Sequence, residues 1–103
     1  MTVIELLNAL KITGELRKYF QDALNYVIEE EQNFLDINLA KDIYPHLAEI
    51  YELSPLTVKT KFIRMVCEFN KEHPKILKRY FGMNTKMTVK KVLTLMLVKL
   101  DVR

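Results

Sequence analysis

Near the middle of the chain, two segments with helical apolar spacing meet at a short break, and this feature constrains the fold most strongly. In the first segment, Leu47, Ala48 and Tyr51 recur at i, i+1 and i+4, which places them on one face of a helix. The second segment carries a longer apolar stripe at i, i+4, i+8 and i+11, formed by Val58, Phe62, Val66 and Phe69. Between them, Ser54 supplies a capping hydroxyl and Pro55 suits the first helical position, where its missing N–H is not needed. We therefore expect two helices joined by a tight turn.

This pair spans residues 44–69 and has the spacing of a helix-turn-helix, whose second helix usually enters the major groove of DNA. In that interpretation Ala48 lets the helices approach, Leu53 fills the turn and Val58 anchors the second helix from inside. Glu52 stands at the turn position that is often glycine. Because plain αα-hairpins share this spacing, the pattern alone leaves DNA reading and simple helix packing both open.

Charge is distributed unevenly along the chain. Residues 1–52 hold 4 basic and 10 acidic side chains, a net charge of −6, whereas residues 53–103 hold 12 and 3, a net charge of +9. Such asymmetry points to nucleic-acid contact, because basic side chains neutralise phosphates. Surface lysines also keep proteins soluble, but solubility explains a mixed surface better than a segregated one. The net charge changes sign along the chain close to where the expected second helix begins.

Composition limits the class of fold. Half of the 103 residues are hydrophobic, and only two glycines and three prolines occur, so we expect one all-α domain over residues 1–103, a compact bundle of about six helices. The single cysteine, Cys67, excludes an internal disulfide, fits a reducing cytoplasm and is expected to be buried beside the apolar stripe. The longest apolar run, at residues 92–98, is too short to span a bilayer, and no signal peptide is recognised. We expect a cytoplasmic protein without membrane contact.

Further helices are expected on both sides of the central pair. Apolar spacing and turn signals place them at residues 2–10, 16–31, 39–44, 75–81 and 89–100. In the second of these, either Ala23 or Ile28 completes the inward face. Gly82 suits the left-handed position after one helix, and Thr88 suits the cap of the last. The last helix also holds Leu95 and Val98 outside its apolar face, which suits a homodimer contact.

No arrangement for catalysis is recognised. Asp42 and His46 stand at i and i+4, but Pro45 interrupts the helix between them and no third ligand follows at metal-binding spacing. Two glycines exclude a glycine-rich phosphate loop, and neither His46 nor His73 has a serine or cysteine placed by a catalytic pattern. We expect a protein that is not an enzyme, with no catalytic residues, no cofactor and no metal.

Taken in order, several segments resemble the C-terminal DNA-binding effector domain of the sporulation-initiating response regulator, the stage zero sporulation protein A family. These segments are LRKYFQDALNYV, LAKDIYPHLAEIYELSP, TVKTKFIR, the pair Phe81-Gly82 and KMTVKKVLTLMLVKL, which together cover roughly residues 12–100. The most specific pieces are Ile43-Tyr44-Pro45, Ala48 with Tyr51, Ser54-Pro55 with Val58, Phe81-Gly82 and Thr88.

The resemblance implies an all-α domain of about six helices that binds double-stranded DNA, commonly as tandem copies. It further implies a transcription regulator that contacts the RNA polymerase sigma subunit. The receiver domain that precedes the effector domain in the family does not occur in this sequence. The starting methionine and the leading helix favour a lone effector-type protein over a fragment.

In the family, the exposed start of the recognition helix carries a glutamate and several arginines that contact DNA. Aligned without a gap from Ser54-Pro55, those positions are Thr57, Lys59, Thr60 and Ile63 here, and a shift of one residue places Arg64 at the last arginine position. From a recognition helix at about residues 55–70, we expect base contacts by Thr57, Lys59, Thr60, Lys61 and Arg64. Candidate phosphate contacts are Ser54, Lys75, Lys78, Arg79, Lys86, Lys90 and Lys91.

Two alternatives to DNA reading remain at this point. The basic side chains can simply form a solvated helix face. The replacement of the family's arginines by Thr57, Thr60 and Ile63 also favours a helical protein-interaction module, an adaptor or regulator of a transcription factor. In such a module the acidic N-terminal half would be the docking surface.

Overall fold

The first two helices follow from local signals in the sequence. The computed structural model describes residues 1–30, 36–82 and 88–100. Helix α1 (Val3–Ala9) begins with a reciprocal cap, in which the Thr2 hydroxyl accepts the Glu5 N–H at 3.1 Å and the Glu5 carboxylate accepts the Thr2 N–H at 3.1 Å. These bonds to Thr2 hold the pKa of Glu5 below its usual range. Helix α2 (Gly14–Glu29) follows after a turn in which Lys11 and Gly14 adopt positive φ.

The first half of the expected helix-turn-helix begins in an unusual way. A π-helical turn (Leu39–Ile43), capped by the Asn38 side chain, runs without a gap into α3 (Tyr44–Tyr51). The Tyr44 N–H reaches back to the Leu39 carbonyl, one residue further than in an α-helix. The sequence predicts a separate short helix here, with a new helix starting at Pro45. The new helix does form, but the wider turn joins the two segments directly.

The second half is the long helix α4 (Pro55–Glu72). Ser54 caps it as predicted, with its hydroxyl accepting the Thr57 N–H at 3.1 Å. Between α3 and α4, Glu52 adopts the left-handed conformation, with φ of 55° and ψ of 45°. The turn therefore has the backbone that normally selects glycine, although a glutamate occupies it.

The last two helices are short. Helix α5 (Ile76–Phe81) ends at Gly82, whose φ of 69° confirms the predicted left-handed position. Helix α6 (Val89–Lys99) begins at Thr88, whose hydroxyl accepts the Lys91 N–H at 3.2 Å, again as predicted. On α6, Leu95 is half-buried and Val98 is 52% exposed, as the apolar pattern predicts.

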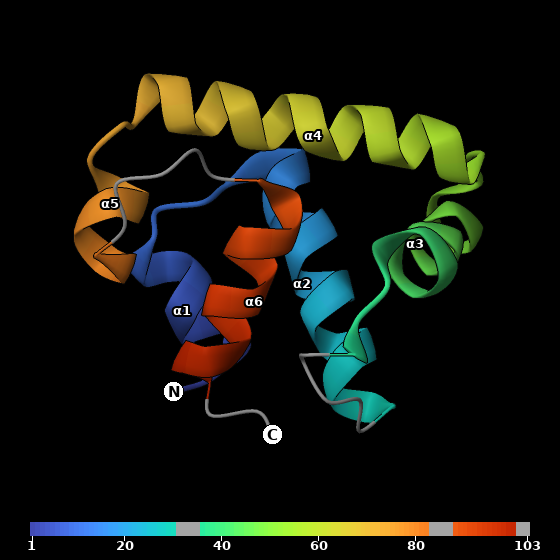
Figure 1. Ribbon diagram of the computed structural model, residues 1–103, viewed down its shortest axis with the longest axis horizontal. Helices are drawn as coiled ribbons and strands as arrows, with labels where there is room; N and C mark the ends of the chain where they lie inside the picture. Colours follow the sequence, from blue (N-terminus) through green and yellow to red (C-terminus); the bar gives the residue numbers. More distant parts are fainter. Residues whose placement is uncertain (31–35, 83–87, 101–103) are drawn as a thin grey trace.

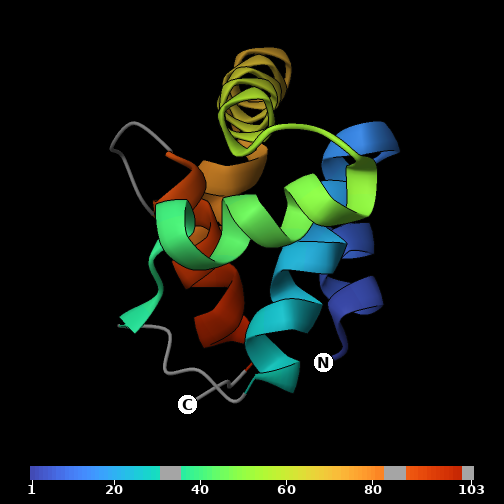
Figure 2. The same cartoon turned by 90° about the vertical axis from the view of Figure 1, so that its right-hand side faces the viewer.

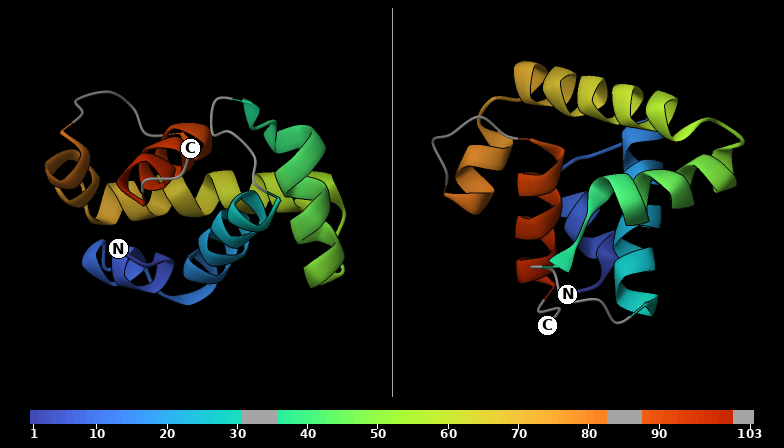
Figure 3. Two further views of the ribbon diagram at one scale, coloured as in Figure 1. Left: turned by 90° about the horizontal axis from the view of Figure 1, so that it is seen from below. Right: turned by 45° about the vertical axis from the view of Figure 1, so that its right-hand side comes forward.

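Helix α4 lies across one side of the molecule, and all the other helices lie on the opposite side of it (Figure 1). Viewed along α4, none of the other helices in the described part of the chain covers its outer surface (Figure 2). Helices α2 and α6 run away from α4 into the body of the protein (Figure 3). Phe62 fixes this crossing, because its ring packs edge-on against two aromatic rings of α2. The ring centroids lie 5.4 Å apart for Tyr19 and 5.0 Å apart for Phe20. The described residues are all-α, with six α-helices and no strand.

One burial prediction is corrected, and one open alternative is resolved. Cys67 is exposed rather than buried, because each helical residue turns about 100° and carries Cys67 away from the stripe that contains Val66. On α2, Ala23 is fully buried and Ile28 is 40% exposed, so Ala23 completes the inward face.

None of the helices in the described ranges is long and apolar enough to cross a membrane.

Candidate nucleic-acid interface

The outer face of α4 is exposed to solvent along several turns of the helix. Thr57, Lys59, Thr60 and Arg64 are all exposed along it. The residues from 55 to 66 contain three basic side chains and no acidic one. At about 100° per residue, Lys59 and Arg64 lie about 140° apart around the helix, so they border the outer face from opposite sides.

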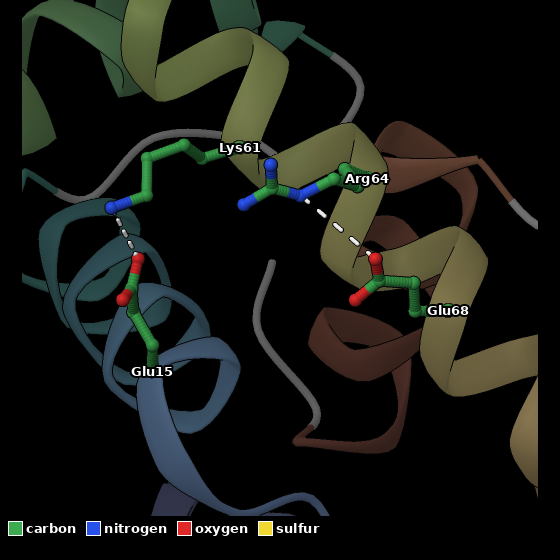
Figure 4. Close-up of polar contacts among 4 residues, drawn as sticks. All are labelled: Glu15, Lys61, Arg64 and Glu68. Carbon is green, nitrogen blue, oxygen red and sulfur yellow. Dashed lines mark ion pairs between the residues drawn. The ribbon is translucent and has the colours of Figure 1, made fainter.

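Lys61, the third basic residue of this segment, turns toward the protein instead. Its Nζ lies 2.7 Å from Oε1 of Glu15 on α2 (Figure 4). This bond to Glu15 raises the pKa of Lys61. The side chain is half-buried beside a hollow that Tyr19 and Tyr51 also line. The structure thus separates Lys61 from the other predicted base-contact residues and uses it to join α4 to α2.

Arg64 has only a loose partner. Its Nε lies 3.9 Å from Oε1 of Glu68, one turn further along α4, and both side chains are more than 60% exposed, at 63% and 62%. An ion pair this exposed contributes little, because solvent screens it. The two terminal nitrogens of the guanidinium point away from Glu68 (Figure 4). Arg64 can therefore exchange this contact for an acceptor outside the protein.

The small hydroxyl side chains of this segment bond within the protein. Oγ1 of Thr60 donates to the Leu56 carbonyl at 3.0 Å, and Oγ1 of Thr57 lies 2.8 Å from Oγ of Ser54. Each hydroxyl has one proton to donate. Thr60 therefore has no proton left for a base, whereas Ser54 and Thr57 share one bond in which either hydroxyl can be the donor.

Two exposed apolar residues on α4 have no place in the predicted contact set. Leu56 is 70% exposed and Ile63 is 42% exposed. Sequence reasoning treated Ile63 only as the position of a replaced arginine and gave Leu56 no role. Their spacing of seven residues, two helical turns, is the signal that could have identified an outward apolar face.

The other predicted phosphate contacts that the structure describes lie beyond α4 in the chain. Lys75, Lys78, Arg79, Lys90 and Lys91 are all exposed around α5 and on α6, whereas Lys86 lies outside the described residues. Lys75 and Arg79 line a pocket of about 190 Å³ together with Lys11, which the sequence analysis did not single out. Lys11 reaches this pocket because the turn after α1 brings it beside α5.

The first helix of the pair is also tied to α2. The Tyr51 hydroxyl donates to the carboxylate of Asp22 on α2. The centroid of the Tyr51 ring lies 5.0 Å from the centroid of the Tyr19 ring, also on α2. Burial, followed by the bond to Asp22, raises the pKa of Tyr51 well above that of an exposed tyrosine. Both helices of the pair are therefore held by one scaffold helix.

Comparison with protein-family models, with curated proteins and with solved structures found no match to this chain. What this surface can bind is therefore inferred from the geometry of its own residues. An outward helix carries two separated cations, an apolar centre and threonines whose hydroxyl groups already bond within the protein. Such a surface can bind a partner that offers anionic walls around a less polar floor.

Proposed function

We propose that this chain is a sequence-specific regulator of transcription that binds double-stranded DNA through α4. The observation that carries the proposal is the outer face of α4, which projects from the molecule and is bordered by Lys59 and Arg64. An α-helix with its side chains is about 10–12 Å across, close to the width of about 12 Å of the major groove. The excess of basic residues in the second half of the chain supports a polyanionic partner.

In this proposal, α3 and α4 form the helix-turn-helix and the remaining basic residues position it. Lys59 and Arg64 approach base edges, where a well-formed bidentate contact discriminates by about 1–3 kcal/mol. Lys75, Lys78 and Arg79 approach the phosphate backbone, which fixes orientation without reading sequence. Resemblance to the sporulation effector-domain family supports the same assignment, together with a cytoplasmic location, tandem or dimeric binding and contact with the sigma subunit.

Fluorescence anisotropy on a labelled random-sequence duplex, repeated over a range of salt concentrations, tests the proposal. We expect binding at low salt that weakens with a log–log slope of about −0.9 for each phosphate contacted. The double variant Lys59→Glu with Arg64→Glu is expected to bind at least about tenfold more weakly at moderate salt, since it replaces attraction by repulsion.

The matched control is Lys41→Glu with Lys99→Glu, which changes the net charge equally. Lys99 is in the last turn of α6, at the end that lies far from α4 (Figure 1). Circular dichroism verifies that every variant is folded. Equal losses in both double variants, or no duplex binding by the folded protein at low salt, would contradict the proposal.

A further inference from the structure

The outer face of α4 has an apolar centre, which we call the α4 stripe and define as Leu56, Thr60 and Ile63. These residues stand at i, i+4 and i+7, so they lie on one side of the helix. Leu56 and Ile63 are large hydrophobic side chains that the protein leaves exposed, at 70% and 42%. A single exposed hydrophobic side chain is ordinary, but two on the face expected to meet a partner suggest that the partner covers them.

Thr60 adds to the apolar character of the stripe. Its hydroxyl donates its only proton to the Leu56 carbonyl at 3.0 Å. The methyl group is then the part of this side chain that the helix does not engage. The centre of the stripe therefore offers carbon atoms where the sequence had suggested a hydrogen-bond donor.

The cations around the stripe indicate what covers it. At about 100° per residue, Lys59 lies about 70° to one side of the centre of the stripe, and Arg64 lies about 70° to the other side. The same pattern of an apolar centre between positive borders matches the floor of the major groove, which presents the C5-methyl group of thymine and the O6 and N7 acceptors of guanine. A purely apolar partner would offer no acceptor to either cation.

We infer that the α4 stripe reads thymine methyl groups, so that this protein selects A·T pairs where Leu56, Thr60 and Ile63 face the groove. The inference rests on the proposed DNA binding and names the bases that α4 prefers. Lys59 and Arg64 then select acceptor-bearing bases, such as guanine, at the borders of the same site.

Replacement of thymine by deoxyuridine isolates this contact, because uracil keeps the pairing and the O4 acceptor and loses only the methyl group. An operator is first selected from a random duplex library with the full chain. Anisotropy is then measured on that duplex and on the same duplex with every thymine replaced by deoxyuridine. We expect weaker binding of the uracil duplex by about fourfold for each methyl group contacted, from the transfer energy of one such group.

The protein variants assign the effect to the stripe. Leu56→Ala and Ile63→Ala are expected to bind the thymine duplex more weakly and to lose most of the preference for thymine over uracil. Ile28→Ala is the matched control, because Ile28 is 40% exposed and lies near the end of α2 that is far from α4. It is expected to keep both the affinity and the preference.

The outcomes separate this inference from the proposed function. Tight binding with equal affinity for thymine and uracil duplexes would overturn the inference and leave DNA binding intact. Loss of the preference in Ile28→Ala to the same extent as in Ile63→Ala would also overturn it. If the folded protein binds no duplex at any salt concentration, both ideas fall, and the α4 stripe would have to serve a protein partner.

Discussion

Glu52 provides a direct test of the turn geometry, since it holds a left-handed backbone in the middle of the helix-turn-helix. The substitution Glu52→Gly removes the side chain that conflicts with this conformation. A residue with a Cβ adopts the left-handed region at a penalty of about 1–2 kcal/mol. Glycine gains additional freedom in the unfolded chain, which offsets about 0.4–1 kcal/mol of that benefit. The free energy of unfolding should therefore rise by roughly 0.5–1 kcal/mol.

Urea unfolding followed by far-UV circular dichroism measures this change, with thermal melting as a second readout. For a domain of this size, the expected gain corresponds to an increase in Tm of about 2–8 °C. Two controls isolate the backbone effect. Glu52→Gln removes the charge and keeps the conflict, so its stability should stay close to that of the native chain. Glu49→Gly makes the same change within helical backbone three residues earlier, and should lower stability by roughly 0.5–1 kcal/mol.

The reasoning would be refuted if Glu52→Gly were no more stable than Glu52→Gln. That result would mean that the left-handed turn carries no penalty, or that the turn adopts another conformation in solution.

Three further predictions concern the contacts that α2 makes with the helix-turn-helix. Tyr51→Phe removes the hydrogen bond to Asp22 and should lower the free energy of unfolding by about 1–2 kcal/mol near neutral pH. Because the folded pKa of Tyr51 is raised above 10, its contribution is full below pH 10 and declines above it, so urea titrations at alkaline pH should show a flatter decline in the variant. Glu15→Gln should change stability by less than about 1 kcal/mol, yet anisotropy should show tighter DNA binding and a steeper salt slope, because Lys61 becomes able to reach phosphate. Phe62→Ala should lower the free energy of unfolding by about 3–5 kcal/mol in urea titrations, since it empties the space between two aromatic rings of α2.

Each of these has a contrary outcome. An equally steep alkaline decline in Tyr51→Phe would assign the pH dependence to other groups. A salt slope that Glu15→Gln leaves unchanged would place Lys61 away from the bound phosphates. A loss below about 1 kcal/mol in Phe62→Ala would show that the ring is not the anchor of α4.

Local signals explain most of the fold that could be predicted. Ser54 and Thr88 cap the helices that follow them, and Gly82 adopts the left-handed backbone, because each depends on only a few neighbouring residues. The apolar stripe of α4 also lies inward as predicted. Cys67 was misassigned because it is adjacent to the stripe in sequence, whereas one further residue on a helix turns it toward solvent.

The candidate site was less predictable, since its side chains depend on tertiary packing. Lys61 looked equivalent to Lys59 in the sequence, but only the folded chain brings it to Glu15. Thr60 looked like a donor to bases, and its choice of the Leu56 carbonyl depends on a rotamer that no spacing rule specifies. The basic composition of the region could be read from the sequence, whereas the partner of each side chain could not.

Helix α2 holds both halves of the helix-turn-helix, through Tyr51 on α3 and through Phe62 and Lys61 on α4. The angle between α3 and α4 is thus fixed before any partner arrives, which keeps the entropy lost on binding small. If α4 binds DNA as proposed, a helix held in this way cannot adjust to the local width of a groove. In that proposal the duplex bends or twists to fit, so easily deformed base steps in an operator would contribute to selectivity even where no side chain touches them.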